Sequence, residues 1–285
     1  MTLGDRVARA REAIAAAGIR PEDASLDAEV LARKLLACDR AGFVVRLRDE
    51  EPGDFADAYR ALVARRCRRE PIAYILGERE FWGLPFEVTP DVLIPRPETE
   101  LIVEEALELF PAGQPPGVIV DAGTGSGCLA VALALEFEHA RVIATDISGP
   151  ALAVARRNAA RNGAGHRIDF REGNLLEPVM ETADLIVSNP PYVASGDEAG
   201  LVPEVRDHEP HVALFGGGDD GLTMVERVVR EAPALLRPGG HLVFEFGFGQ
   251  EVEVEALVKR SRALTLLDLK RDIQGIARTA VARRT

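Results

Sequence analysis

Four consecutive residues, Asn189-Pro190-Pro191-Tyr192, have the groups needed for chemistry on a planar amino group. An amide or aromatic amine is a poor nucleophile because its nitrogen lone pair is delocalised into the adjoining π-system. The side-chain carbonyl of Asn189 and the backbone carbonyl of Pro190 can accept both N–H bonds of such a group, and the prolines add no competing donor. Tyr192 can stack on a flat substrate. The tetrad predicts alkylation of nitrogen, with Asn189, Pro190 and Tyr192 catalytic and all four residues binding substrate, although Asn-Pro is also common in plain turns.

A glycine-rich loop is the candidate site for the alkylating group. Gly123-Thr124-Gly125-Ser126-Gly127 follows the apolar run 118–120, and glycine lets the backbone approach a ligand closely. The dinucleotide fingerprint GxGxxG would require glycine where Cys128 stands. The shorter GxGxG spacing favours S-adenosyl-L-methionine over NAD, with the five loop residues and Asn189 as cofactor-binding residues.

Asp146 ends the next apolar run, 19 residues beyond Gly127. In nucleotide-binding α/β folds a carboxylate at this point accepts hydrogen bonds from ribose hydroxyls. Asp146 is therefore a further predicted cofactor-binding residue, although an aspartate here would also suit the cap of a helix starting near Pro150.

Alternating strands and helices must position these residues. Strands that are apolar throughout and alternate with helices are typical of a parallel sheet covered on both faces. The β-rich runs are 118–120, 142–145, 168–170, 185–187 and 242–246, with helical stretches such as 128–135 and 151–162 between most of them. Two last runs, 264–269 and 279–283, have no helix between them and are expected to pair antiparallel at an edge. We predict an α/β fold with a Rossmann-like, mostly parallel seven-stranded sheet.

The N-terminal part has helical spacing and predicts a small bundle. One helix carries Val7, Ala10 and Ile14 on one face, a second covers 30–35, and a third runs from Pro52-Gly53 through Val63. The arginines at 65, 66, 68 and 69 are expected to form a solvated helix face or a partner-binding patch. Residues 74–77 and 84–88 flank a glycine-containing turn and suggest a β-hairpin.

These patterns divide the chain into three parts. We predict an N-terminal helical domain at 1–72, a β-hairpin and connector at 73–98, and the domain of alternating strands and helices at 99–285.

Composition and charge exclude several classes of protein. The chain has 285 residues and a net charge of −12; residues 1–85 carry 15 Lys/Arg and 15 Asp/Glu, so the excess of acid lies entirely after residue 85. An acidic second half is a poor groove for nucleic acid, whose phosphates are bound by cations. The three cysteines are far apart and form no metal or disulfide pattern, so no metal is expected. No apolar run is long enough to span a bilayer and no export signal is visible, which predicts a cytoplasmic protein.

Beyond these motifs, the chain closely resembles the HemK/PrmC family, the release-factor glutamine N5-methyltransferases. The resemblance covers nearly the whole chain, and the motif at 93–100, with a helical N-terminal domain, is its most specific part. The blocks that resemble the family are 71–77, 80–83, 93–100, 121–127, 189–192, 209–210, 220–222 and 245–247.

The resemblance implies a class I S-adenosyl-L-methionine-dependent methyltransferase, with S-adenosyl-L-homocysteine as product. Family members methylate the glutamine of the Gly-Gly-Gln motif in class I peptide chain release factors. It implies that the tetrad binds the glutamine and that residues 1–72 recognise the release factor. The segment 96–100 would lie near the cleft, or its charges would pin the domains together. Where the family often has an acidic and an aromatic residue, this chain has Asn174 and Leu175, which are expected to contact the adenine.

Two other functions share some of these features. An enzyme that methylates adenine or guanine in nucleic acid would use the same tetrad, but it would need a basic groove. A non-catalytic module that binds S-adenosyl-L-methionine would keep the glycine loop and not need the tetrad. No exposed coiled-coil pattern argues for assembly, so a monomer is expected that binds neither nucleic acid nor membrane.

Overall fold

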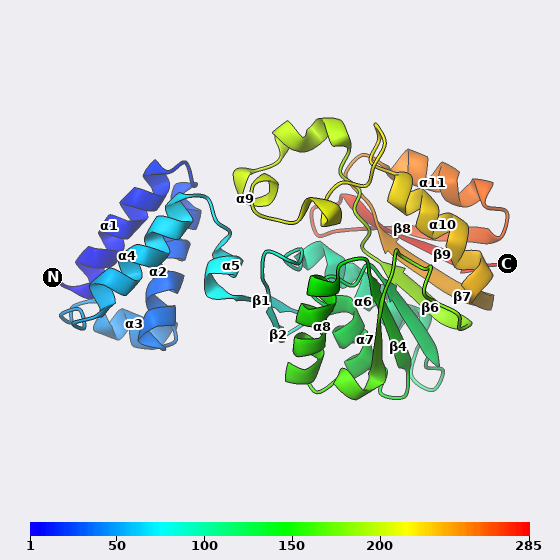
Figure 1. Ribbon diagram of the computed structural model, residues 1–285, viewed down its shortest axis with the longest axis horizontal. Helices are drawn as coiled ribbons and strands as arrows, with labels where there is room; N and C mark the ends of the chain where they lie inside the picture. Colours follow the sequence, from blue (N-terminus) through cyan, green and yellow to red (C-terminus); the bar gives the residue numbers. More distant parts are fainter. The chain divides into compact units, whose positions relative to one another are not determined.

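The computed structural model describes residues 1–285, and the chain forms two compact units (Figure 1). The first unit consists of Met1–Gly77 together with Val202–His208. The second consists of Glu78–Leu201 and Glu209–Thr285. None of the helices is long and apolar enough to cross a bilayer.

The first unit is a bundle of helices. They are α1 (Leu3–Ala16), α2 (Pro21–Leu36), α3 (Arg40–Arg46), α4 (Phe55–Cys67), α5 (Ile72–Leu76) and α9 (Pro203–Arg206). Leu31, Phe43 and Tyr59 are buried at its centre. The three predicted helices are present, and Pro21 is the first residue of α2, where its missing N–H costs nothing. The short α3, whose N-terminus Asp39 caps, was not predicted because seven residues show too little periodicity.

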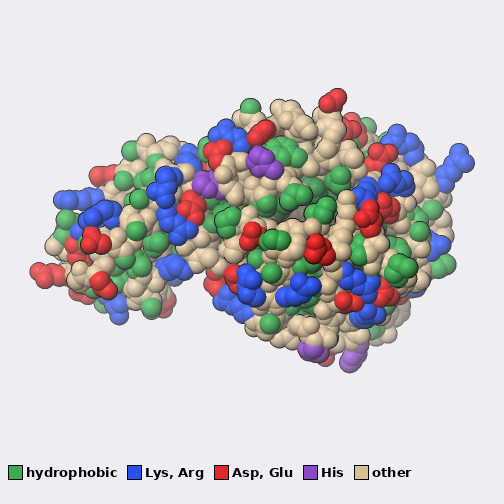
Figure 2. All heavy atoms as spheres, viewed as in Figure 1, with side chains coloured by type: hydrophobic (Ala, Val, Ile, Leu, Met, Phe, Trp, Pro, Cys, Tyr) green, Lys and Arg blue, Asp and Glu red, His purple; other side chains and the backbone are tan.

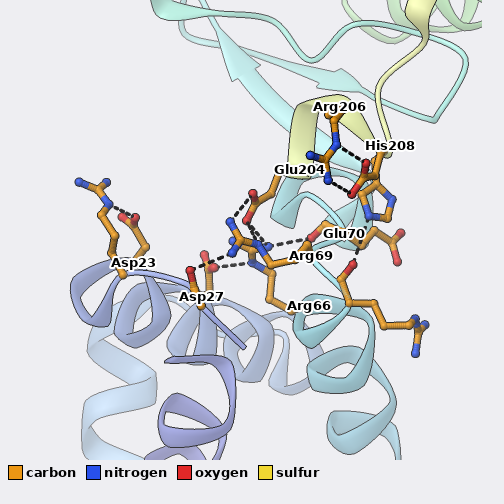
Figure 3. Close-up of polar contacts among 12 residues, drawn as sticks. Asp23, Asp27, Arg66, Arg69, Glu70, Glu204, Arg206 and His208 are labelled. Carbon is orange, nitrogen blue, oxygen red and sulfur yellow. Dashed lines mark hydrogen bonds and ion pairs between the residues drawn. The ribbon is translucent and has the colours of Figure 1, made fainter. Parts of the chain in front are cut away.

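Of the arginines at the end of α4, only Arg68 is exposed, and the other three pair with carboxylates of the same unit, which corrects the expectation of a solvated face or a free patch for them. Arg66 is only 6% exposed, and its Nε donates to Asp27 Oδ2 at 2.6 Å. Arg66 and Arg69 both donate to Glu204 of α9, Arg69 through two nitrogens at 2.8 and 2.6 Å (Figure 3). Arg65 pairs with Glu70. Arg66 and Arg69 therefore join α9 to the helical bundle.

The second unit begins with a hairpin of β1 (Glu78–Phe81) and β2 (Leu84–Glu87). The turn residues Trp82 and Gly83 have φ of 54° and 70°, the left-handed conformation of a tight two-residue turn. The predicted first strand at 74–77 is wrong, because residues 72–76 are helical and Gly77 ends that helix with φ of 73°. The hairpin's Phe81 and Phe86 are buried in the core of the second unit.

A seven-stranded sheet forms the centre of the second unit and confirms the predicted fold class. Its order is β5-β4-β3-β6-β7-β9-β8, and β9 alone runs in the direction opposite to the other six strands. The strands are β3 (Val118–Ala122), β4 (Arg141–Asp146), β5 (Ile168–Glu172), β6 (Ala183–Ser188), β7 (Leu236–Glu245), β8 (Leu264–Arg271) and β9 (Ala277–Arg284). The last two pair antiparallel as expected, with β8 at the edge.

Helices cover both faces of this sheet. Successive residues of β3 point to opposite faces, so that Ile119 packs with α6 and α7, whereas Val120 packs with α10. The helices are α6 (Glu100–Leu109), α7 (Cys128–Glu136), α8 (Gly149–Arg161), α10 (Thr223–Leu235) and α11 (Glu251–Arg260). Short 3-10 turns lie at Pro97–Thr99, Gly165–Arg167, Ser195–Gly200 and His211–Ala213.

The strand order positions the site. The chain leaves β3 for β4 on one side, and β6 lies on the other, so the loops that follow β3 and β6 diverge at their carboxyl ends. Ligands of open α/β sheets bind at such a reversal.

Candidate active site

The loops after β3, β4 and β6 surround one cavity of about 230 Å³. It collects nine of the twelve residues predicted from the sequence and leaves out Gly127, Pro190 and Tyr192. The predicted residues that line it are Gly123, Thr124, Gly125, Ser126, Asp146, Asn174, Leu175, Asn189 and Pro191. All of the lining residues belong to the second unit.

The glycine loop lies against β4 and faces the cavity. The backbone N–H groups of Gly123 and Thr124 donate to the carbonyl of Thr145, and that of Gly125 donates to Asp146 Oδ2 at 2.8 Å. Gly123 and Gly125 have φ of 77° and 54°, and open space lies where a Cβ would stand. Any larger residue would be strained here and would extend into open space.

Gly127 differs from the other two loop glycines. A Cβ at this position would lie 3.0 Å from the Cβ of Ala155 in α8. Gly127 does not line the cavity. It is the N-cap residue of α7 and has a φ of 81°. It therefore lets α8 pack closely against the loop.

Asp121, near the end of β3, anchors the glycine loop and the start of α7 through hydrogen bonds. Its Oδ2 accepts from the hydroxyl of Thr124 at 2.6 Å and from the backbone N–H of Ala130 at 3.1 Å. Its Oδ1 is buried and has no partner within the chain. Burial raises the pKa of Asp121 to about 7.

Asp146 also accepts backbone donors, with Oδ2 on Gly125 and Oδ1 on Ser148 at 2.9 Å. It does not cap α8, because Ser148 does so by accepting from the backbone N–H of Ala151. Asp146 lines the cavity, and each of its oxygens has a second lone pair. The ribose contact predicted for it remains a prediction.

Asn189 lies at the carboxyl end of β6 with its side chain held in one orientation. Its Nδ2 donates to Thr99 Oγ1 at 3.0 Å, and no group of the chain donates to its carbonyl oxygen. Thr99 in turn donates to Glu245 Oε2 at 2.6 Å. Asn189 therefore lines the cavity with its acceptor atom free.

Tyr192 is anchored by its hydroxyl group, which donates to Glu245 Oε1 at 2.8 Å. Burial and the neighbouring Glu245 raise the pKa of Tyr192 well above its usual value, so the phenol stays protonated. Its ring does not line the cavity, and stacking on the substrate remains a prediction. Pro190 is buried.

The backbone of the tetrad is fixed by a second loop. Val193 N–H donates to the carbonyl of Leu214, and Gly216 N–H donates to that of Val193. A Cβ on Gly216 would lie 2.5 Å from the carbonyl oxygen of Pro191, so only glycine allows this approach. Gln250 Nε2 donates to the carbonyl of Tyr192 at 3.0 Å.

Asn174 and Leu175 follow β5 and line the cavity. Leu175 has a φ of 53°, and its carbonyl accepts from the Thr145 hydroxyl at 2.7 Å. The contacts predicted for these two residues with adenine remain predictions.

Sequence reasoning missed Thr99 and Glu245 as individual site residues. The signal for Glu245 was a carboxylate in the apolar run 242–246, where an unpaired charge would be costly. Thr99 lies in the segment 93–100, whose Arg96 pairs with the buried Glu209. Arg96 and Glu209 both belong to the second unit, so their ion pair does not join the two units.

The residues present fit a nucleoside that carries a charged amino-acid tail. The glycine loop after β3 leaves open space beside its backbone. Asp146 at the end of β4 adds a carboxylate to the cavity, and Asn189 after β6 adds an amide group. Asp121, whose buried Oδ1 has no partner, lies behind the glycine loop and does not itself line the cavity.

Strand order, glycine loop and tetrad together define a class I methyltransferase that depends on S-adenosyl-L-methionine. A family model described as the methyltransferase small domain matches residues 99–205, and one described as the PrmC N-terminal domain matches residues 6–77. The 16S rRNA N2 G1207 methyltransferase of Thermus thermophilus, solved with S-adenosyl-L-methionine and guanosine, has a TM-score of 0.53. It is 19% identical, with 73% of this chain and 50% of that chain covered, and shows a common fold.

Curated relatives show the family. The release factor glutamine methyltransferase of Geobacter sulfurreducens is 48% identical over 242 residues, which cover 84% of this chain and 83% of that protein. That of Cereibacter sphaeroides is 43% identical over 99% of both chains. The chain belongs to the release factor glutamine methyltransferase family.

Proposed function

We propose that this protein transfers the methyl group of S-adenosyl-L-methionine to the side-chain amide nitrogen (N5) of the glutamine in the Gly-Gly-Gln motif of class I release factors. The observation that carries the proposal is the free carbonyl oxygen of Asn189 in the cavity. An acceptor here suits a substrate that presents N–H groups.

The chain's own residues position and polarise the amide. Asn189 Oδ1 and the carbonyl oxygen of Pro190 accept hydrogen bonds from its two N–H groups, which raises the electron density on the nitrogen and holds it in position for attack. S-adenosyl-L-methionine supplies an electrophilic methyl group when it is bound. Positive charge that develops on the nitrogen is stabilised by both carbonyl dipoles. The alkylated nitrogen then loses its proton to these acceptors or to water, so no dedicated base is needed.

We assign the cofactor to the glycine loop, Asp146, Asn174 and Leu175. The loop would bind the amino-acid tail, Asp146 the ribose hydroxyls, and the last two residues the adenine. Gly127 would support the cofactor site indirectly, by letting α8 pack closely against the glycine loop. Tyr192 would support the neighbouring substrate site indirectly, through its hydrogen bond to Glu245.

We propose that residues 1–72 recognise the release factor, with 73–98 as connector and 99–285 as methyltransferase domain. The enzyme would act as a monomer in the cytoplasm, without direct contact to nucleic acid. Basic and acidic side chains are mixed over the face drawn in Figure 2, with no continuous basic surface for phosphates there.

The test is mass spectrometry of a release factor incubated with the protein and S-adenosyl-L-methionine. We expect the glutamine of Gly-Gly-Gln to gain the mass of one CH2 group. The same reaction is run with total RNA and DNA, and methylation of nucleic acid alone would overturn the proposal in favour of the nucleic-acid enzyme.

Asn189→Ala is the matched variant. It removes an acceptor at the reacting nitrogen, so we expect turnover to fall at least about 100-fold while the dissociation constant of the cofactor changes little. Isothermal titration measures the second quantity. Unchanged turnover would support the non-catalytic module.

A further inference from the structure

Four side chains of the second unit form one hydrogen-bonded chain, which we call the Glu245 chain. Asn189 Nδ2 donates to Thr99 Oγ1, Thr99 donates to Glu245 Oε2, and Tyr192 donates to Glu245 Oε1. Its members come from the tetrad after β6, the turn at Pro97–Thr99 and β7. Thr99 is 2% exposed and Glu245 is 1% exposed, so solvent does not replace these bonds.

With Glu245 ionised, the Glu245 chain has one consistent direction. Burial raises the pKa of Glu245 above its usual value, and the hydrogen bonds from Thr99 and Tyr192 act against this. A carboxylate that accepts from two hydroxyl groups has no proton of its own to give. Thr99 has a single hydroxyl proton, which it gives to Glu245, and it can therefore only accept from Asn189. If the amide of Asn189 were reversed, its oxygen would face the lone pair of Thr99 Oγ1 and leave a buried group unsatisfied.

The direction of the chain fixes which atom of Asn189 faces the cavity. Because Nδ2 is bound to Thr99, the carbonyl oxygen is the atom left for the substrate. An amide NH2 group can donate to that oxygen, whereas a carboxylate of the same shape is acceptor-only and would meet it with repulsion. Glutamine and glutamate differ in this group alone.

We propose that Glu245 and Thr99 are positioning residues that hold Asn189 as an acceptor, and thereby make the site select a glutamine amide over a glutamate carboxylate. This inference rests on the proposed function and deepens it. Neither residue needs to touch the substrate. Their effect passes through the orientation of one amide group.

Thr99→Val tests the inference, because valine keeps the shape of threonine and removes both hydrogen bonds. We compare binding of a release factor with glutamine at the Gly-Gly-Gln tip and one with glutamate there, both in the presence of S-adenosyl-L-homocysteine. The preference for glutamine should fall at least about 10-fold, since the freed amide can turn its NH2 toward the carboxylate. The kcat on the glutamine form should fall as well, with the KM for the cofactor unchanged.

Two controls separate orientation from general damage. Thr99→Ser keeps both hydrogen bonds and should retain the wild-type preference. Thr279→Val removes another buried threonine hydroxyl, directly opposite Glu245 in the sheet, whose Oγ1 has no partner. It should bind and turn over like the wild type.

Glu245→Gln is the second variant and keeps the volume of the side chain if Thr99→Val fails to fold. A glutamine can donate as well as accept, so it no longer dictates the direction of the chain, and the preference should again fall. A wild-type preference in either Thr99→Val or Glu245→Gln, or a loss of preference in Thr99→Ser, would overturn the inference.

A substrate-independent measurement separates this inference from the proposed function. In 15N-labelled protein, the side-chain NH2 proton that Asn189 donates to Thr99 should exchange slowly in the wild type and in Thr279→Val, and rapidly in Thr99→Val. If the wild type methylates no release factor, the proposed function fails, whereas the exchange of this proton still decides the direction of the Glu245 chain. Rapid exchange in the wild type would refute that direction.

Discussion

Asp121 is a buried carboxyl group whose pKa of about 7 makes it sensitive to pH near neutrality. Its pKa in the unfolded chain is near 3.8, so protonation favours the folded state. This contribution is fully present below the unfolded pKa and is lost as the pH rises through about 7. The physical reason is that ionisation leaves a charge in a fully buried site with one oxygen unpaired.

We therefore expect Asp121→Asn to flatten the pH dependence of stability in the cofactor-free protein. Since one pKa unit is about 1.4 kcal/mol, the isolated group accounts for up to about 4 kcal/mol between pH 4 and pH 8. Urea unfolding at a series of pH values measures this. Parallel curves for variant and wild type would show that Asp121 titrates in its ordinary range.

Gly127 combines a positive φ with a close neighbour, and the two effects can be separated. Gly163 also has a positive φ, of 78°, but has open space around it. Gly163→Ala should cost about 1–2 kcal/mol from backbone strain alone. Gly127→Ala should cost about 1–3 kcal/mol more, because its Cβ meets Ala155. Equal losses in chemical denaturation would mean that α8 moves away without cost.

At the scale of elements, α9 is joined to the helical bundle by ion pairs, and none of its four residues is fully buried. Burial alone would raise the pKa of Glu204, but hydrogen bonds from Arg69 and Arg66 lower it, so the carboxylate is ionised at neutral pH. Four residues make too short a helix to be stable by themselves. The side chain of Glu204 is only 17% exposed, which makes its ion pairs stronger than surface ones.

Glu204→Ala should lower the free energy of unfolding of the first unit by about 3 kcal/mol, because it leaves Arg66 and Arg69 without this partner. Amide exchange of residues 203–206 should accelerate. Glu198→Ala, at an exposed position of the preceding turn, serves as the control and should change neither quantity. Undiminished protection of α9 in Glu204→Ala would show that apolar packing holds it.

The short elements show where local patterns stop being informative. The five parallel strands were predicted because each contains a short run rich in apolar or β-branched residues, continuous in all of them except β5, where Asp169 interrupts it. Residues 72–76 have the same apolar character but form α5, since a run of five residues has no period that separates helix from strand. The β1 strand was missed because three of its four side chains are exposed.

At the scale of the whole molecule, the cavity belongs to the second unit alone. A cofactor present at 100 times its dissociation constant stabilises the folded state by about 2.7 kcal/mol. We expect S-adenosyl-L-homocysteine to slow amide exchange in the loops after β3, β4 and β6 and to leave α1–α4 unchanged. Protection of those four helices by the cofactor would contradict this assignment.

The sequence by itself determined the fold class, and it predicted the glycine loop and the tetrad as site residues, because these depend on local spacing: strand, glycine turn and helix follow one another along the chain. Only the tertiary structure decided the partners of the charged and polar groups. Arg66 and Glu204 are 138 residues apart, and Asn189 and Thr99 are 90 apart. Such pairs leave no local periodicity, since they form only when separate elements pack together and a buried polar group must find whichever partner lies across the interface.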